Sequence, residues 1–438
     1  MLTGSIERLV VRKSSGMVLG ILGIMLFFLA DSWFIALLGT EALAAMSFIM
    51  PVSFIVTSLA MGMGVGMSAI VGRMLGAQET QYARRFISDS LLLTVVLVGA
   101  LATMGYLSID WLFLSLGAEA SIMPYITEYM QIWYIGVLFL VIPMVGNAAI
   151  RASGNMRLPA TVMLISGALN AILDPIFMFS LGLGIKGAAL ASAVAWVLTF
   201  VVSIRVLHVK LHFIDWRWPG LSALLTNWGT MLKMGIPSAA SQMLNPIAQT
   251  IIVSVLANFG LFGVAALGFA MRVESVVLIV GMALSTIVPT VFGQNYGAKQ
   301  WHRASHSIRY SLKLALIFYL GIYFLLWPTA PYIARFFSEQ QEVIEIATSY
   351  LRILPLSYAL LSISSITSSL LTALHRPISS LLFNIVRLFG FVIPAVYFGA
   401  QWAGVMGVFW GLCLSTGIFG LGAYVYTLRL LRQVEGAA

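Results

Sequence analysis

The sequence predicts an all-α integral membrane protein in which twelve transmembrane helices form two parallel six-helix lobes with a central cleft. The first reason is composition, because 60% of the 438 residues are hydrophobic and only 9% are charged, whereas soluble domains carry about 25% charged residues. The second reason is an internal repeat, since the segment that begins at Gly72 recurs 221 residues later at Gly293. Six helices per repeat give both halves the same orientation in the membrane.

Each of the twelve predicted helices is an apolar stretch of the length that a bilayer requires, about 20 residues. Strands of an outer-membrane barrel are excluded, because they alternate apolar and polar residues over about 10 positions. The apolar stretches begin near Gly16, Ala45, Phe86, Pro124, Leu158, Ile185, Met231, Val264, Ser307, Ser349, Ser379 and Gly404.

The repeat is clearest after the second helix of each half. Gly72-Arg-Met-Leu-Gly76-Ala77 there matches Gly293-Gln-Asn-Tyr-Gly297-Ala298, and Gly39 matches Gly260 at the same offset. We therefore divide the chain into an N-terminal six-helix lobe at 1–207, a cytoplasmic inter-lobe linker at 208–228 and a C-terminal six-helix lobe at 229–438.

The linker is the longest polar stretch of the chain. Its basic residues and its tryptophans, Trp216 and Trp218, favour a helix that lies at the membrane interface.

The net charge of +9 is a topology signal rather than a nucleic-acid surface. Basic residues gather before the first helix and after the even-numbered helices, for example at Arg84 and Arg85 and at Lys299 and Arg303. Lysine and arginine mark the cytoplasmic side of a membrane, so we expect both termini in the cytoplasm and a multi-pass location in the cell inner membrane. We read the start of the chain as a first membrane helix rather than a cleaved leader.

Two aspartates lie inside apolar stretches of the first half, and none stands at the matching places of the second. Asp31 is well inside the first helix, and Asp174 follows Asn170 by four residues, so these two share a helical face. An acid inside the membrane is costly and indicates a functional site. Away from water a carboxyl group holds its proton more readily, so these residues predict a proton-coupling site or a sodium site.

Polar groups in the second half are less decisive. Glu274 is an acid in the eighth predicted helix, where it could contact a cationic substrate or pair across helices. Gln242, Asn245 and Gln249 form one stripe of the seventh helix and could line the cleft. Asn384 and Arg387 give a weaker signal, because a long arginine side chain can reach the interface.

Motifs for enzymes are absent from the sequence. There is no Gly-x-x-x-x-Gly-Lys-Ser/Thr phosphate loop, so we expect no ATP hydrolysis. A single cysteine, Cys413, allows no intrachain disulfide and no cysteine metal site. We expect no cofactor, no firm metal site and no enzymatic activity.

These motifs together resemble the multidrug and toxic compound extrusion (MATE) family along the whole chain. Typical features are the two Gly-x-x-x-Gly-Ala segments and Met271-Arg-Val-Glu274. Asp31, Asn170, Asp174 and Ser192 match the cation site of the prokaryotic DinF-like branch. The resemblance implies that protonation of Asp31 rearranges its hydrogen bonds and bends the first helix.

The resemblance also implies a secondary multidrug exporter that exchanges protons for organic cations or amphiphilic drugs by alternating access. The NorM-like branch has an acid in the seventh helix where this chain has Asn245, so we expect coupling in the N-terminal lobe. Sodium, bound at Asp31, Asn170 and Asp174, is the alternative coupling ion. The expected partners are small organic substrates and membrane lipids, no nucleic acid, with the protein a monomer.

Three other functions were weighed. A lipid-linked oligosaccharide flippase of the same superfamily usually needs more basic residues in its cavity, whereas the intramembrane charge read from this sequence is acidic. An enzyme would need a convergent set of catalytic groups within the spans. A channel is distinguished by flux that does not depend on an ion gradient.

Overall fold

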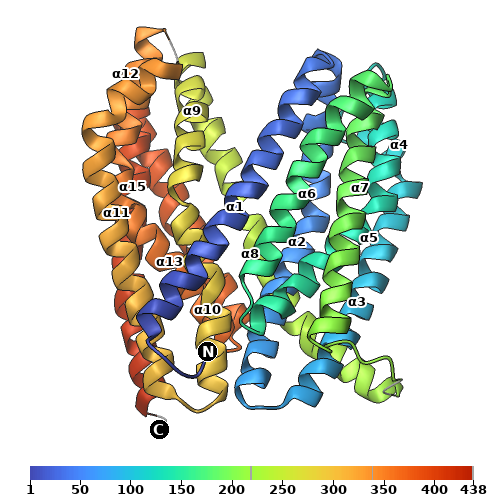
Figure 1. Ribbon diagram of the computed structural model, residues 1–438. Coiled ribbons are helices and arrows are strands. Elements are labelled where there is room, and N and C mark those ends of the chain that lie inside the picture. Colours follow the sequence, from blue (N-terminus) through green and yellow to red (C-terminus); the bar gives the residue numbers. More distant parts are fainter. Residues whose placement is uncertain (218–219, 338, 437–438) are drawn as a thin grey trace. The chain divides into compact units, whose positions relative to one another are not determined.

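The computed structural model describes residues 1–217, 220–337 and 339–436, and helices make up nearly all of these ranges (Figure 1). No strand occurs within the described ranges. The elements in order are α1 (Ile6–Leu37), α2 (Thr40–Gly76), α3 (Thr80–Leu107), α4 (Ile109–Ser115), α5 (Met123–Ala152), α6 (Arg157–Pro175), η1 (Ile176–Ser180), α7 (Gly184–Arg205), η2 (Val206–Lys210), α8 (Leu221–Ala257), α9 (Leu261–Val277), α10 (Ile279–Gly297), α11 (Trp301–Phe337), α12 (Gln341–Ile353), α13 (Pro355–Ala373), α14 (Pro377–Ile385), η3 (Val386–Val392) and α15 (Ile393–Gly436), where η marks a π-helix.

The described helices account for the predicted membrane crossings. Ten of them are long and apolar enough to span a bilayer, and α9 with α10, bent by 47° at their junction, form an eleventh span. The tenth of these helices, Pro377–Gly436, contains a kink at Ala403 and Gly404, where the backbone leaves the helical conformation. That kink divides it into two crossings, so the predicted twelve-helix architecture is confirmed.

The backbone repeats as the sequence does. α2 covers Thr40–Gly76, and α9 with α10 covers Leu261–Gly297, the same interval 221 residues later. Both helices end at a residue in the left-handed region, Gln78 with φ 64° and Lys299 with φ 58°. Such a residue stops a helix and satisfies its last carbonyl groups. The repeated Gly-x-x-x-Gly-Ala segments therefore form equivalent helix-ending turns.

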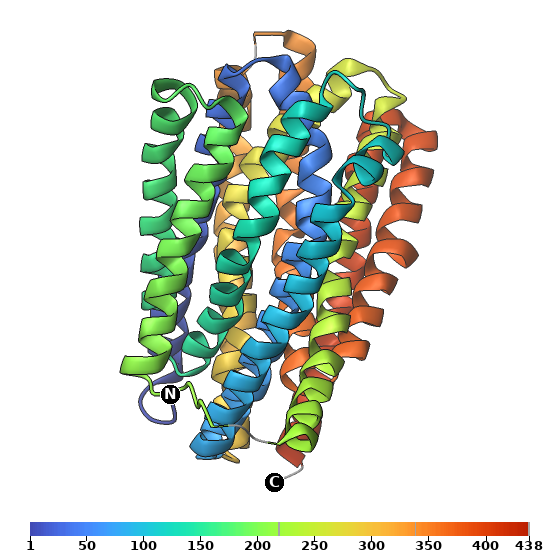
Figure 2. The ribbon, with the colours of Figure 1, turned by 90° about the vertical axis from the view of Figure 1, so that its right-hand side faces the viewer.

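By packing, the described chain forms two compact units. The N-terminal unit is Ser15–Ala239, and the C-terminal unit is Met1–Ser14 with Ala240–Ala438. In the N-terminal unit α5 packs against α2, α3 and α7, which can be followed in Figure 2. In the C-terminal unit α13 packs against α10, α11 and α15. The lobe limits read from the sequence repeat remain a proposal about the duplicated segments.

The unit boundary lies inside α8 because the first half of this helix packs tightly on α2. A side chain at Gly62 would collide with the backbone of Ala239, and one at Gly66 would lie 3.1 Å from Cβ of Met234. Glycine removes the side chain where two helices approach closely. The glycine-rich part of α2 thus serves close helix contact.

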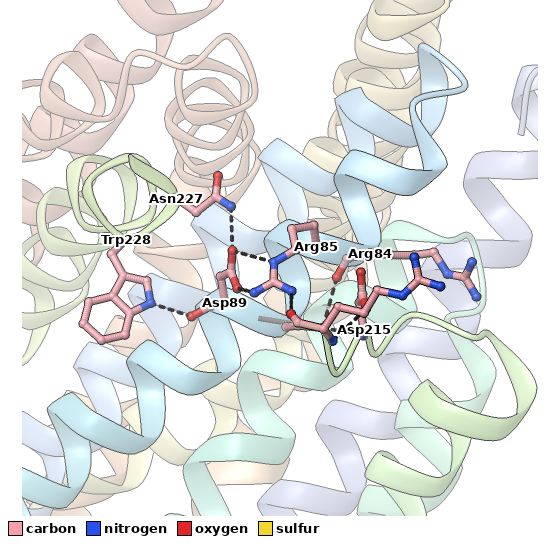
Figure 3. A network of polar contacts seen from close by, with 8 residues as sticks. Arg84, Arg85, Asp89, Asp215, Asn227 and Trp228 are labelled. Carbon is pink, nitrogen blue, oxygen red and sulfur yellow. Dashed lines mark hydrogen bonds and ion pairs between the residues drawn. The ribbon is translucent and has the colours of Figure 1, made fainter. Parts of the chain in front are cut away.

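The part of the linker that the structure describes contains no separate interfacial helix, because η2 ends at Lys210 and α8 begins at Leu221. Residues 211–217 are irregular, and Trp218 lies outside the described residues. The reason is that α3 supplies hydrogen-bond partners for this backbone, so a helix is not needed to satisfy it. Arg84 and Arg85 donate to the carbonyls of His212 and Arg217, and the Asp215 amide donates to Ser88 at 2.7 Å. Figure 3 shows Arg84, Arg85 and Asp215 of this network.

Asp89 anchors the start of α8 in the same network (Figure 3). Its carboxylate is 2% exposed and accepts hydrogen bonds from Arg85 at 2.6 Å and from Asn227 at 2.7 Å. Its backbone carbonyl accepts from the Trp228 indole at 2.8 Å. Asp89 is therefore a buried acid whose charge is compensated.

Candidate cation-coupling site

The N-terminal unit gathers the four residues of the predicted coupling site. Asp31 comes from α1, Asn170 and Asp174 come from α6, and Ser192 comes from α7. All four are buried, with Asp31 8% exposed and Asp174 0% exposed. They lie in helices long and apolar enough to cross the membrane.

Asn170 joins α6 to α7 at this site. Its amide nitrogen donates to Oδ1 of Asp174 at 3.3 Å and to Oγ of Ser192 at 3.1 Å. The four-residue spacing of Asn170 and Asp174 places them on one face of α6. Pro175 cannot donate a backbone hydrogen bond, and directly after it the helix widens into η1. Such π-helical turns are frequent at functional sites.

Asp31 approaches this pair from α1. The carboxyl groups of Asp31 and Asp174 are close enough to repel each other when both are ionised, and Tyr129 of α5 lies near both. No described lysine or arginine forms an ion pair with either aspartate. The site therefore collects negative charge without a compensating cation from the described chain.

Three oxygen atoms of this site lack a hydrogen-bond partner among the described residues. They are Oδ1 of Asp31, Oδ1 of Asn170 and Oδ2 of Asp174, all buried. A buried acceptor without a donor costs about 1–3 kcal/mol. A proton on one carboxyl group would supply a donor, and a small bound cation would supply positive charge. The chemistry that fits this arrangement is reversible binding of a proton or a small cation.

Glu274 of the C-terminal unit has a partner across helices. The hydroxyl of Tyr350 in α12 donates to its carboxylate, and the Tyr350 ring lies 5.1 Å from that of Phe409. Arg272, two residues before Glu274, is exposed. Glu274 thus links α9 to α12 through this hydrogen bond.

The three polar residues predicted to form one stripe, all in α8, differ in how buried they are. Gln242 is partly buried, whereas Asn245 and Gln249 are exposed. Asn245 accepts a hydrogen bond from Arg387 at 2.9 Å. Arg387 is only 8% exposed, so its side chain lies inside the unit. Sequence reasoning gave this residue too little weight, and the nearby polar positions Ser241, Asn245 and Asn384 were the available signal.

Comparison with known proteins places the chain in a family. The sequence profile of the MatE family matches it twice, at residues 17–176 and 237–398. The chain is 36% identical to the FAD transporter of Shewanella oneidensis over 99% of this chain and 97% of that protein. It is 24% identical to the multidrug export protein MepA of Staphylococcus aureus, over 94% and 92% of the two chains.

Solved structures agree with this assignment. The crystal structure of the Vibrio cholerae MATE transporter VcmN in the bent form covers 98% of each chain, with a TM-score of 0.93 and 29% identity. An outward-facing MATE family transporter of the MOP superfamily covers 99% of this chain and 98% of its own, with a TM-score of 0.92 and 27% identity. The chain therefore belongs to the MATE family of multi-pass membrane transporters and is not an enzyme.

Proposed function

We propose that this transporter is a secondary exporter that exchanges protons for organic cations or amphiphilic molecules. The coupling residues are Asp31, Asn170, Asp174 and Ser192. The observation that carries the proposal is the set of three buried oxygens without partners on two acids and an amide. We propose further that the transporter operates in the cell inner membrane as a monomer with both termini in the cytoplasm.

The geometry supports a simple exchange step. With both aspartates ionised, two negative charges repel each other in a buried site, so binding one proton is favourable. The protonated carboxyl becomes a donor that can reach one of the unpaired oxygens. Because Asp31 is on α1 while Asn170 and Asp174 are on α6, the new bond changes how α1 is held against α6. This is how proton binding biases the transporter between two conformations.

The test is uptake of ethidium and norfloxacin into inverted vesicles that contain the protein, with sodium absent and a pH gradient imposed. Proton coupling predicts uptake driven by the pH gradient alone and lost in Asp31→Asn. The matched control is Asp89→Asn, since Asp89 is equally buried but fully paired. Transport that needs a sodium gradient would assign the site to sodium, and flux without any gradient would indicate a channel.

A second candidate substrate is a flavin nucleotide. It is favoured by one observation, the 36% identity over 99% of this chain to a protein named FAD transporter. The test adds FAD outside the same inverted vesicles and follows its uptake by flavin fluorescence. Uptake of FAD but not of ethidium, driven by the same pH gradient, would select this candidate.

A further inference from the structure

Arg387 is a buried cation near the middle of a membrane span. It lies in η3, ten residues after α14 begins at Pro377, which is about 15 Å along a helix. That is about half of the roughly 30 Å hydrocarbon core. A charged residue at this depth that is 8% exposed is expensive, and such residues mark pathways for substrates or ions.

On one edge of the Arg387 guanidinium, one nitrogen has a hydrogen-bond acceptor among the described residues and the other has none. Among the ion pairs of the described chain none involves this residue. Nη2 donates to Oδ1 of Asn245 at 2.9 Å, whereas Nε is buried and has no hydrogen-bond partner in the part of the chain that the structure describes. Nε and Nη2 lie on the same edge of the guanidinium, which is the edge that binds two oxygens of a carboxylate or phosphate. The amide oxygen of Asn245 occupies one of those two positions, and the other has no acceptor.

The surrounding polar groups hold this edge in place. Asn384, three residues before Arg387, donates to Ser241 of α8 and to Ser368 of α13, both at 2.8 Å. Ser241 and Asn245 are four residues apart on α8 and face Asn384 and Arg387 respectively. Asn245 is itself exposed, so the partner that fills the guanidinium edge is within reach of an incoming molecule.

Aromatic rings flank the arginine along its own helix. Phe383 and Phe391 lie one turn to either side of Arg387, and the Phe419 ring is 4.8 Å from the first and 5.3 Å from the second. Aromatic surfaces of this kind suit a flat ring system. An arginine one turn from such rings along the helix suits a molecule that joins a flat ring to an acidic group.

We propose that Arg387 and Asn245 form a subsite that binds an oxyanion group, phosphate or carboxylate, of the transported molecule. An oxygen of that group pairs with Nε, and a second takes the place of the Asn245 amide on Nη2. This inference rests on the proposed export function and extends its substrates from cations to organic anions and zwitterions that carry a flat ring.

The test is binding of two probes that differ by one phosphate, flavin mononucleotide (FMN) and riboflavin. Both are titrated by flavin fluorescence against the full chain in nanodiscs of phosphatidylcholine, with ethidium as a cationic reference. The wild type is expected to prefer FMN. Arg387→Gln is expected to weaken FMN binding at least about tenfold, the loss expected for a charged hydrogen-bonding pair, and to leave riboflavin and ethidium nearly unchanged.

Two further variants guard the interpretation. Arg387→Lys keeps the charge but loses the two-pronged edge, so FMN binding should fall between the wild type and Arg387→Gln. Arg272→Gln removes an exposed arginine of the same unit and should bind all three probes as the wild type does. Retained riboflavin binding shows that each variant is folded.

Equal affinity of the wild type for FMN and riboflavin would overturn the proposal, as would an equal loss of all probes in Arg387→Gln. If phosphatidylglycerol added to the nanodiscs shows the dependence on Arg387 and FMN does not, the site holds a lipid headgroup instead. These assays use no ion gradient, so failure of proton-driven export would appear separately, as absent flux with the FMN preference intact.

Discussion

The two units bury charged side chains of opposite sign, and each set lacks the opposite kind of hydrogen-bond partner. In the N-terminal unit Asp31 and Asp174 have acceptor atoms that lack donors, whereas in the C-terminal unit Arg387 has a donor that lacks an acceptor. The duplicated halves keep the same helix-ending turns at Gln78 and Lys299, yet their polar interiors have diverged. Our two proposals together assign a division of roles, in which one half receives the proton and the other receives a group of the substrate.

Asp174→Asn tests the acidic side of this comparison with the largest expected effect. The variant keeps the size of the side chain but removes one of the two mutually repelling charges, so proton binding at Asp31 no longer relieves repulsion. We expect pH-driven ethidium uptake in sodium-free vesicles to fall to that of vesicles without the protein. Uptake equal to that of the wild type would remove Asp174 from the coupling site.

Asp89→Asn sharpens the comparison because Asp89 is a buried acid with all its partners present. The new amide would face the donors of Arg85 and Asn227 and would replace an ion pair, so we expect a loss of about 1–3 kcal/mol in stability. A lower melting temperature in detergent should show this. The pH dependence of uptake, normalised to folded protein, should stay that of the wild type, and a shifted dependence would mean that paired acids also couple.

Ser192→Ala has the smallest expected effect. It removes one of two acceptors of the Asn170 amide, worth about 0.5–1.5 kcal/mol, so uptake should fall by about two- to tenfold. Ser192→Thr keeps the hydroxyl and should restore uptake, which a merely steric role would not predict. Complete loss in Ser192→Ala would instead make the hydroxyl a direct ligand of the coupling ion.

Most of the fold could be predicted from the sequence, because apolar length and the repeat at Gly72 and Gly293 are local and additive signals. The grouping of Asp31, Asn170 and Asp174 was also within reach, since the two aspartates are acids in apolar stretches and Asn170 lies one turn from Asp174, while their role in coupling stays a prediction. The boundary between the two packed units could not be predicted, because it lies inside α8 and depends on the contact of Gly62 with Ala239.

Two features could not be predicted because they depend on tertiary partners. The described part of the linker has no separate helix, since Arg84 and Arg85 of α3 satisfy the carbonyl groups of His212 and Arg217. An arginine side chain in a membrane helix can extend to the interface or stay inside, and sequence alone does not decide between these. For Arg387 the decision comes from Asn245, 142 residues away in the chain. With Arg387 buried in a span, the charge inside the membrane helices is not only acidic, so it no longer counts against a flippase.

The most direct test of this division of roles is proton movement in sodium-free proteoliposomes that contain a pH-sensitive dye. An imposed gradient of ethidium or of FMN would drive substrate across the membrane while the dye reports protons. The account predicts opposite proton flow with either substrate in the wild type, none with either in Asp31→Asn, and flow with ethidium but not with FMN in Arg387→Gln. Proton flow in Asp31→Asn equal to that of the wild type, or equal losses for both substrates in Arg387→Gln, would contradict it.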